Sequence, residues 1–203
     1  MSPIRAMGPI LPCEPCAFHK TNLMKLKRDF IYIILIALLL ATIGQLVYSY
    51  KYIPHKQREV AVYYNRDVEA NREIIKTIQN ANQFVYFAVY TFTRNDLKDA
   101  LLGAKHRGLD VQGITDKDQL VKIELQGKII KELREAGIPV STQDHLGIMH
   151  LKTVVTDTGY VSGSYNWTAA ATNMNDEVIE VGTDEALRSQ YEKVLRKLLT
   201  KYP

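Results

Sequence analysis

Cysteine is almost absent from this 203-residue chain, and the two present, Cys13 and Cys16, both lie near the N-terminus. No disulfide framework therefore holds the remaining residues together. No second Cys/His pair with zinc-site spacing follows the CEPC segment, and no βαβ pattern surrounds it. The CEPC segment is therefore better explained as part of a Pro-rich tail, or as the result of a start codon placed too early, than as a zinc or redox site. A second long apolar run is also missing, which excludes a multi-pass membrane protein.

A strong excess of one charge is missing as well. The 26 basic and 22 acidic residues give a net charge of +4, but eight of the basic and two of the acidic residues precede residue 59. Residues 59–203 therefore hold 18 basic and 20 acidic residues, a net charge of −2. This larger part lacks the positive charge that nucleic-acid-binding proteins commonly use. Its apolar content excludes a disordered protein, since the whole chain is 46% apolar and 24% charged.

One apolar run is long enough to cross a bilayer. Phe30–Tyr48 holds 19 residues without a charge, close to the ~20 that a membrane-spanning helix needs. A buried core helix is an alternative, although such helices seldom lack a polar face over their whole length. Three basic residues between Met24 and Asp29 precede the run, and the positive-inside rule places that end in the cytoplasm. We expect an N-in, C-out signal anchor, or else a cleaved signal peptide that starts at Met24 and ends near 47–49.

The chain is therefore expected to have four parts. These are a cytoplasmic tail at 1–29, a transmembrane signal anchor at 30–48, a linker at 49–58 and a globular domain at 59–203. With the N-terminus in the cytoplasm, the globular domain is exported to the periplasm or the cell exterior. If the apolar run is cleaved as a signal peptide, the domain is secreted.

Within residues 59–203, apolar runs typical of strands alternate with amphipathic segments typical of helices. The expected strands are 60–64, 84–90, 110–115 and 138–141, and the expected helices are 68–81, 95–106, 120–136 and 187–199. The continuous run FVYFAVY predicts a strand buried on both faces. Asn95 or Asp96 is expected to cap a helix, and Gly108 and Gly137 are expected to end helices. The alternation predicts an α/β fold, a mixed β-sheet flanked by helices and preceded by one transmembrane helix.

Residues 150–168, HLKTVVTDTGYVSGSYNWT, carry the polar side chains that indicate chemistry. The segment is typical of a β-hairpin with its turn at 157–159. His150 and Lys152 lie two residues apart in an extended stretch, so both project from one face of the strand. The return arm brings a glycine, a hydroxyl and an amide back towards them: Gly163, Ser164 and Asn166.

Together these side chains can bind and cleave a phosphodiester. A histidine acts as a nucleophile or as a general acid and base. The ammonium of Lys152 fits a phosphate oxygen, and Ser164 and Asn166 add neutral donors to the same oxygens. Such a set stabilises the charge that develops around phosphorus. We expect the carboxylate of Glu177, just before VIEV, to accept the proton of the second ring nitrogen of His150 and fix its tautomer.

The pattern resembles the signature of the phospholipase D superfamily, H-x-K-x4-D followed by G-S-x-N. The matching residues are His150, Lys152 and Asp157 in the first part and Gly163, Ser164 and Asn166 in the second. Upstream, residues 88–93 (AVYTFT), 105–111 (KHRGLDV) and 137–140 (GIPV) are similar to the small single-motif bacterial endonucleases of that superfamily. The resemblance covers about residues 60–200. One residue fewer than usual separates Asp157 from Gly163, which a shorter hairpin turn accommodates.

The resemblance implies a two-step displacement. His150 attacks phosphorus and forms a phosphohistidine, while a second histidine protonates the leaving oxygen and then activates water. Because this chain holds one copy of the motif, the resemblance also implies a homodimer with its active site at the two-fold interface. It implies no metal and no other cofactor. Asp157 is a catalytic candidate by membership of the motif, although a local structural role at the turn is equally expected. His145 is expected to be an ordinary surface residue.

The substrate is open among three alternatives. The resemblance favours a nonspecific endonuclease on DNA or RNA, although a domain of charge −2 then needs a local basic patch around Lys105, Arg107, Lys117 and Lys122. A phospholipase D acting on phosphatidylcholine or cardiolipin-like lipids is the main alternative, because an anchor holds the domain at a lipid surface. The third is an inactive, membrane-tethered binding module, although such a protein has no chemical need for so complete a set of polar side chains.

Overall fold

The structure of this chain is a computed structural model that describes residues 14–52 and 60–203. Several expectations lie outside the described residues: those for the first part of the cytoplasmic tail with Cys13, for most of the linker, and for the first residue of the globular domain. The chain separates into two compact units, Met1–His55 and Lys56–Pro203.

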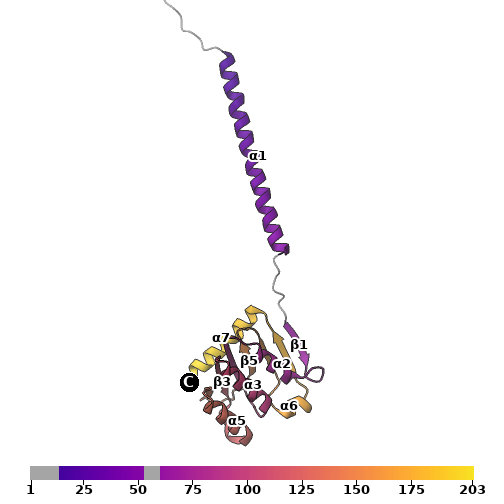
Figure 1. Cartoon of the computed structure of the whole chain (residues 1–203), viewed down its shortest axis with the longest axis vertical. Coiled ribbons are helices and arrows are strands. Elements are labelled where there is room, and N and C mark those ends of the chain that lie inside the picture. Colours follow the sequence, from indigo (N-terminus) through magenta and orange to yellow (C-terminus); the bar gives the residue numbers. More distant parts are fainter. Residues whose placement is uncertain (1–13, 53–59) are drawn as a thin grey trace, which may run out of the picture. The chain divides into compact units, whose positions relative to one another are not determined.

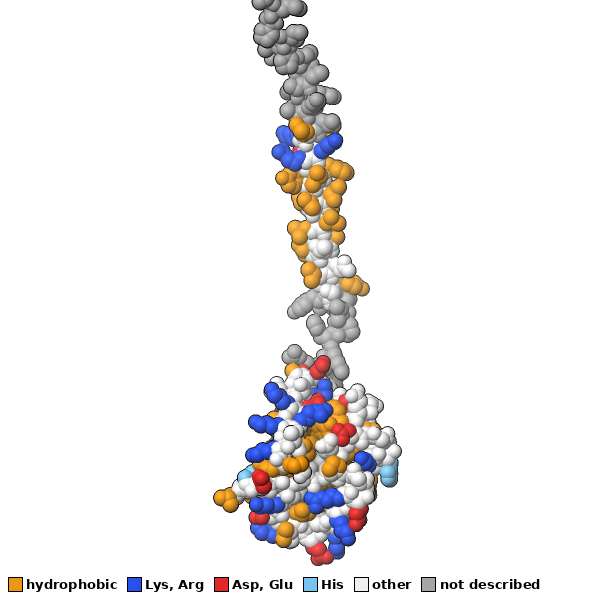
Figure 2. Space-filling model, turned by 90° about the vertical axis from the view of Figure 1, so that its left-hand side faces the viewer, with side chains coloured by type: hydrophobic (Ala, Val, Ile, Leu, Met, Phe, Trp, Pro, Cys, Tyr) orange, Lys and Arg blue, Asp and Glu red, His pale blue; other side chains and the backbone are white. Residues whose placement is uncertain are grey.

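Helix α1 (Glu14–Tyr52) contains the apolar run. Its segment Met24–Ser49 has 26 residues, a mean hydropathy of 2.6 and no buried part. The segment is therefore not a core helix, and its length and composition are sufficient to cross a bilayer. Figure 2 shows Lys and Arg side chains at the end of this apolar stretch that holds Lys25, Lys27 and Arg28.

The globular unit is built on one seven-stranded sheet with the order β1-β7-β6-β5-β2-β3-β4 (Figure 1). The strands are β1 (Val60–Tyr64), β2 (Phe84–Val89), β3 (Asp110–Thr115), β4 (Val140–Thr142), β5 (Lys152–Thr156), β6 (Tyr160–Gly163) and β7 (Val178–Gly182). β2, β3 and β4 pair in parallel, and the other neighbours pair antiparallel. The sheet is mixed, which confirms the predicted architecture.

Helices cover both faces of this sheet. They are α2 (Ala70–Gln79), α3 (Asn95–His106), α4 (Lys117–Lys122), α5 (Glu124–Glu135), α6 (Ala169–Asn173) and α7 (Glu185–Lys201). One core lies between the sheet and α2, α3 and α5, and a second lies under α7. Because successive residues of a strand face opposite ways, β2 supplies Val85 and Phe87 to the first core and Tyr86 and Ala88 to the second. This explains why its sequence is a continuous apolar run.

The globular unit holds its own cores. Every buried side chain among the described residues lies between Asn65 and Tyr202. Because both cores are made of residues of this unit, we expect the unit to fold as a separate polypeptide.

The helix expected at 120–136 is two helices in the structure. α4 and α5 are separated at Ile123, whose backbone is extended (φ −109°, ψ 99°). The first helix also begins earlier than expected, because Asp116 caps it. The Asp116 carboxylate accepts hydrogen bonds from the backbone N–H groups of Asp118 and Gln119, each at 3.0 Å.

Smaller boundary differences occur elsewhere. Helix α3 begins after Arg94, so neither Asn95 nor Asp96 is its cap, and the Asp96 carboxylate forms an ion pair with Arg94 instead. Gly108 (φ 85°) and Gly137 (φ 76°) follow α3 and α5 in the left-handed conformation, as their positions predict. α2 is shorter than the expected 68–81 helix, and β4 begins two residues after the expected start of its strand.

Candidate active site

The β5–β6 hairpin brings the two halves of the motif to one end of the sheet. Thr153 lies opposite Ser162, so Lys152 at the start of β5 lies beside Gly163 at the end of β6. Lys152 also lies opposite Val89, the last residue of β2. We name this end of the sheet the motif end, formed by the residues that follow β2 and β6 and precede β5 and β7. The opposite end, which holds the 157–159 turn, is the turn end.

His150 lies two residues before β5, and its side chain is exposed. Its ring packs against the ring of Tyr90 at an interplanar angle of 62°, with 4.7 Å between the ring centroids. Within residues 14–52 and 60–203 the structure shows no hydrogen bond to either ring nitrogen. An exposed imidazole of this kind keeps a lone pair available for attack on phosphorus.

Lys152 is buried, with 7% of its surface exposed. Its ammonium donates a hydrogen bond to the backbone carbonyl of His150 at 2.9 Å and lies 5.4 Å from the ring centroid of Tyr90. Burial lowers the pKa of Lys152, and the negative charge of Glu177 opposes that shift in part. A desolvated cation with one backbone acceptor is costly to hold, so an anionic substrate group is well placed to compensate it.

Glu177 does not orient His150 within one protomer, contrary to the expectation. One of its carboxylate oxygens accepts the hydroxyl proton of Ser164, and the other accepts a hydrogen bond from the Asn175 amide at 3.0 Å. Its backbone N–H donates to the Asn65 side chain at 2.9 Å. The Glu177 carboxylate is therefore engaged by Ser164 and Asn175. Its effect on the site is electrostatic, because its negative charge acts on Lys152.

The two predicted neutral donors differ in availability. The hydroxyl of Ser164 is engaged, since it donates to Glu177 and accepts from the backbone N–H of Val178 at 3.1 Å. The Asn166 side chain accepts a long hydrogen bond from the backbone N–H of Thr91, at 3.4 Å. No partner for its NH2 group is shown among the residues that the structure describes. Asn166 is thus the better placed donor for a phosphate oxygen.

Asp157 lies at the turn end, away from the other motif residues. One of its carboxylate oxygens accepts hydrogen bonds from the backbone N–H groups of Asn82 and Gln83, at 2.9 and 3.1 Å. Burial acts to raise the pKa of Asp157, but these N–H groups outweigh it and the pKa is lowered. At ~3.3 Å per residue, β5 separates Asp157 from His150 by roughly 20 Å. The position favours the structural role that the sequence left open.

The sequence interpretation missed three residues that build this site. Tyr90 contacts both His150 and Lys152. Asp116, which is fully buried, accepts hydrogen bonds from the Gln143 amide at 2.6 Å and from the backbone N–H of Met149 at 3.0 Å, and so anchors the segment that leads to His150. The third, Asn65, holds the Glu177 loop as described above. Tyr90 and Asp116 each follow the last residue of a buried strand, and this position is a signal that could have found them.

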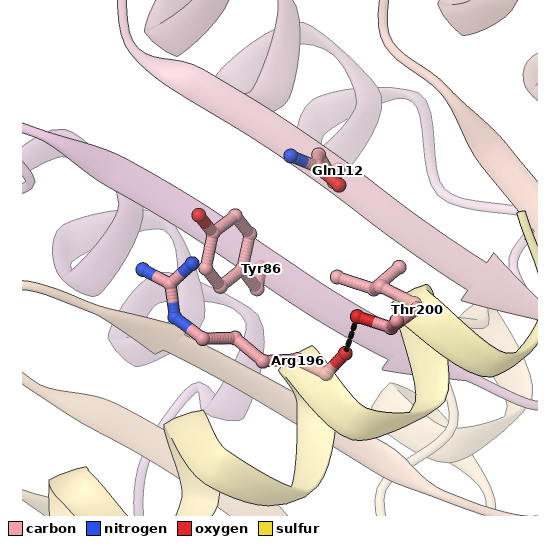
Figure 3. A pocket seen from close by; sticks show the side chains of 5 residues that line it. Tyr86, Gln112, Arg196 and Thr200 are labelled. Carbon is pink, nitrogen blue, oxygen red and sulfur yellow. Dashed lines mark hydrogen bonds between the residues drawn. The ribbon is translucent and has the colours of Figure 1, made fainter.

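The motif does not lie in either described cavity. A cavity of about 240 Å³ is lined by Tyr86, Gln112, Arg196, Leu199 and Thr200, under α7 (Figure 3). The Arg196 guanidinium covers the ring of Tyr86 at 4.7 Å and is paired with Glu192. A second cavity, of about 410 Å³, lies between α2 and α3. No group of three or more His, Cys, Asp or Glu that could hold a metal occurs in the described residues. The His150 side chain is itself exposed to solvent.

The residues expected to form a basic patch are divided between the two ends of the sheet. Lys117 and Lys122 belong to α4, which follows β3 at the motif end. Lys105 and Arg107 lie at the far end of α3, and Arg107 donates to the backbone carbonyls of Ile78 and Ala81. On the face of the globular unit shown in Figure 2, basic and acidic side chains are interspersed. Two lysines, rather than four basic residues, remain near the motif.

Comparison with known families gives one match over most of the globular unit. Residues 74–199 match the family described as "Cardiolipin synthase, PLD-like domain". The chain is 32% identical to a mitochondrial cardiolipin hydrolase of Xenopus tropicalis over 130 residues. This aligned region covers 64% of this chain and 60% of that protein. The chain is 26% identical over 136 residues to a phospholipase D of Rickettsia typhi, covering 66% of this chain and 65% of that protein. The chain thus spans less than two thirds of the length of these relatives.

Solved structures match the same part of the chain. The phospholipase D family member Nuc from Salmonella typhimurium superposes with a TM-score of 0.67 at 25% identity, covering 72% of this chain and 97% of Nuc. NucT from Helicobacter pylori gives a TM-score of 0.65 at 24% identity and shows the shared fold. The match covers nearly the whole of each of these proteins, 97% of Nuc and 98% of NucT.

Proposed function

The chain belongs to the phospholipase D-like family, and on that premise we propose that it hydrolyses phosphodiester bonds of DNA or RNA, with little sequence preference, through a covalent intermediate on His150. The observation that carries this proposal is an exposed imidazole beside a buried ammonium whose hydrogen bond goes to a backbone carbonyl. A nucleophile and an undercompensated cation at one strand end are what attack on a phosphodiester anion requires.

In the proposed reaction, a ring nitrogen of His150 attacks phosphorus and the bond to the leaving oxygen breaks. Lys152 and the Asn166 amide hold the non-bridging oxygens. A second histidine gives its proton to the leaving oxygen, then takes a proton from the water that breaks the phosphorus–nitrogen bond and releases His150. Since the globular unit has one such motif, we propose that the second histidine is the same residue of a second copy in a symmetric homodimer.

Two features support a polymer that approaches from solution. The His150 side chain is exposed, so a long chain in solution can reach it. The polypeptide also enters the sheet at Val60, which lies opposite Gly182, and Gly182 in turn lies opposite Tyr160 at the turn end. The attachment point of the globular unit and His150 are therefore at opposite ends of the sheet. Lys117 is a candidate cation for a neighbouring phosphate, and Lys122, which forms an ion pair with Asp118 at 3.5 Å, is a second.

A phospholipid is the second candidate substrate, because apolar side chains are exposed in the segment next to His150. Leu146 is completely exposed, Ile148 is 54% exposed and Leu151 is 38% exposed. Such side chains beside a nucleophile fit the interface of a lipid aggregate. Relatives named as cardiolipin hydrolase and phospholipase D add support for this substrate class.

Direct hydrolysis assays decide between the candidates. Residues 59–203 are incubated with plasmid DNA, with RNA and with vesicles of phosphatidylcholine or cardiolipin, all in excess EDTA. We expect nucleic acid to be cleaved and the activity to survive EDTA. Hydrolysis of vesicles alone would replace the nuclease with the phospholipase, and in that case Leu146→Ser should lower vesicle hydrolysis. No turnover on any of the three would favour the inactive binding module.

The dimer is tested by mixing subunits. Wild-type and His150→Asn protein are mixed in equal amounts and allowed to exchange subunits. If a symmetric dimer needs both histidines, only the wild-type homodimers are active, so the activity per total protein falls to roughly a quarter of the wild-type value. A self-sufficient subunit keeps about half under the same scheme. A sample that is monomeric in light scattering and fully active would contradict the shared site.

A further inference from the structure

The side chain of Tyr90 contacts both central residues of the motif, His150 and Lys152. It directly follows β2 at the motif end. Its ring meets the His150 ring with 4.7 Å between centroids, and the Lys152 ammonium lies 5.4 Å from the Tyr90 centroid. The first contact is in the range of edge-to-face ring pairs, and the second is in the range of cation–π interactions.

The ring of Tyr90 is fixed from several directions. Its backbone N–H donates to the carbonyl of Leu151 at 2.9 Å, and its carbonyl accepts from the Gln126 amide at 3.2 Å. Its phenol oxygen accepts from the Gln119 amide at 3.0 Å. Gln119 is held in turn by the cap that Asp116 makes at the start of α4. A ring so restrained can define the position of a neighbour that has no hydrogen bond of its own.

His150 is such a neighbour. Glu177, the expected orienting group, is taken up by Ser164 and Asn175. The contact of the imidazole with Tyr90 therefore takes the place, within one protomer, of the hydrogen bond that a catalytic histidine commonly donates to a carboxylate. The same ring presents its negative face to an ammonium that burial has desolvated.

We propose that Tyr90 is a positioning residue for the reaction proposed above: its ring holds the imidazole of His150 in the attacking rotamer and keeps the Lys152 ammonium charged beside it. The inference rests on the proposed function of the same site. It assigns the role to the aromatic ring, while the hydroxyl serves to hold the ring in place.

The matched pair of variants is Tyr90→Phe and Tyr90→Met in residues 59–203. Phe keeps the ring and loses the hydroxyl, whereas Met fills similar space without a ring. We expect Tyr90→Phe to keep kcat within about 3-fold, and Tyr90→Met to lower kcat by about 10-fold or more with a smaller change in KM. The alkaline limb of the kcat profile should also move to lower pH in Tyr90→Met, since the charged lysine loses a stabilising contact. Equal kcat and equal pH profiles for the two variants would overturn the proposal.

A spectroscopic readout separates this inference from the proposed function. Residues 59–203 contain three histidines, His106, His145 and His150, and the ring proton signals of His150 are identified by their loss in His150→Asn. The ring current of Tyr90 should shift these signals in the wild type and in Tyr90→Phe, and the shift should collapse in Tyr90→Met while the other two histidines stay unchanged. This result does not depend on any substrate. Unshifted His150 signals in the wild type would refute the positioning role even if the enzyme is active.

Discussion

The two ends of strand β5 hold parts of one sequence motif but treat polar groups in opposite ways. At the motif end, the His150 imidazole is exposed and the Lys152 ammonium is buried against a backbone carbonyl. At the turn end, Asp157 accepts two backbone hydrogen bonds, and the hydroxyl of Thr156 accepts the N–H groups of Thr158 and Gly159. The polar side chains at the motif end are thus available to bind a ligand, whereas those at the turn end are engaged in hydrogen bonds with the protein backbone.

This difference separates function from structure within a single motif. A buried charge with few partners costs stability, whereas a carboxylate with two amide donors contributes to it. A protein retains such a costly arrangement where the buried charge binds a ligand. We therefore propose that the motif end binds a substrate anion, whereas the turn end holds the hairpin against the start of β2.

The largest effect is expected from His150→Asn. Removing the nucleophile should lower kcat by at least about 10³-fold, since no other described side chain at the motif end can form the intermediate. Because the side chain is exposed, the midpoint of thermal unfolding should change by no more than a few degrees. Turnover assays and circular dichroism measure the two quantities. Residual activity near the wild-type level would show that the nucleophile is misassigned.

Lys152→Met should separate activity from stability. We expect kcat to fall by roughly 10²-fold, because the charge that neutralises the phosphate oxygens is lost. The free energy of unfolding should stay equal or rise, because the variant removes a buried cation and replaces it with an apolar chain of similar length. Urea unfolding checks the second point. A marked loss of stability would mean that Lys152 is a structural residue like Asp157, and the contrast between the two ends would fail.

The pH dependence of kcat provides a finer test of the same lysine. Burial lowers the pKa of Lys152 and Glu177 acts to raise it, so the charged form is lost at a lower pH than for an ordinary lysine. Activity should therefore decline on the alkaline side, below the usual range for lysine. Glu177→Gln removes the opposing charge, lowers the pKa further and should move that limb to lower pH. A limb that stays in place or moves upward would contradict the assignment.

Much of this arrangement follows from local sequence patterns, and the rest depends on contacts between distant residues. The strand run at 84–90 and the hairpin at 150–163 could be predicted because alternation and turn residues act locally. The break at Ile123 could not, because neither proline nor glycine marks it in the sequence. The engagement of Glu177 by Ser164 and the place of Tyr90 against His150 arise from strand pairing, which spacing along the chain does not encode.

At the turn end, Asp157→Asn should change stability while it leaves activity alone. The loss of charge-assisted hydrogen bonds to Asn82 and Gln83 should lower the free energy of unfolding by about 1–2 kcal/mol at pH 7. We expect kcat to stay within about 3-fold, since Asp157 lies at the other end of β5. Asp67→Asn, a change at an exposed carboxylate, is the control for general effects of charge. A loss of kcat comparable to that of Lys152→Met would restore Asp157 as a catalytic residue.

The smallest effect is the pH dependence of that stability. The folded pKa of Asp157 is lowered, so its ionised form favours the folded state. The contribution is complete above the unfolded value of ~3.9 and is lost as the pH falls through the folded pKa. The difference in unfolding free energy between wild type and Asp157→Asn should therefore be constant from pH 7 to about pH 5 and shrink at lower pH. Urea titrations at several pH values measure it. If the difference in unfolding free energy grew on acidification, the Asp157 carboxylate would not be held in its ionised form. The turn end would then not be the end of β5 at which the polar groups are satisfied by the protein.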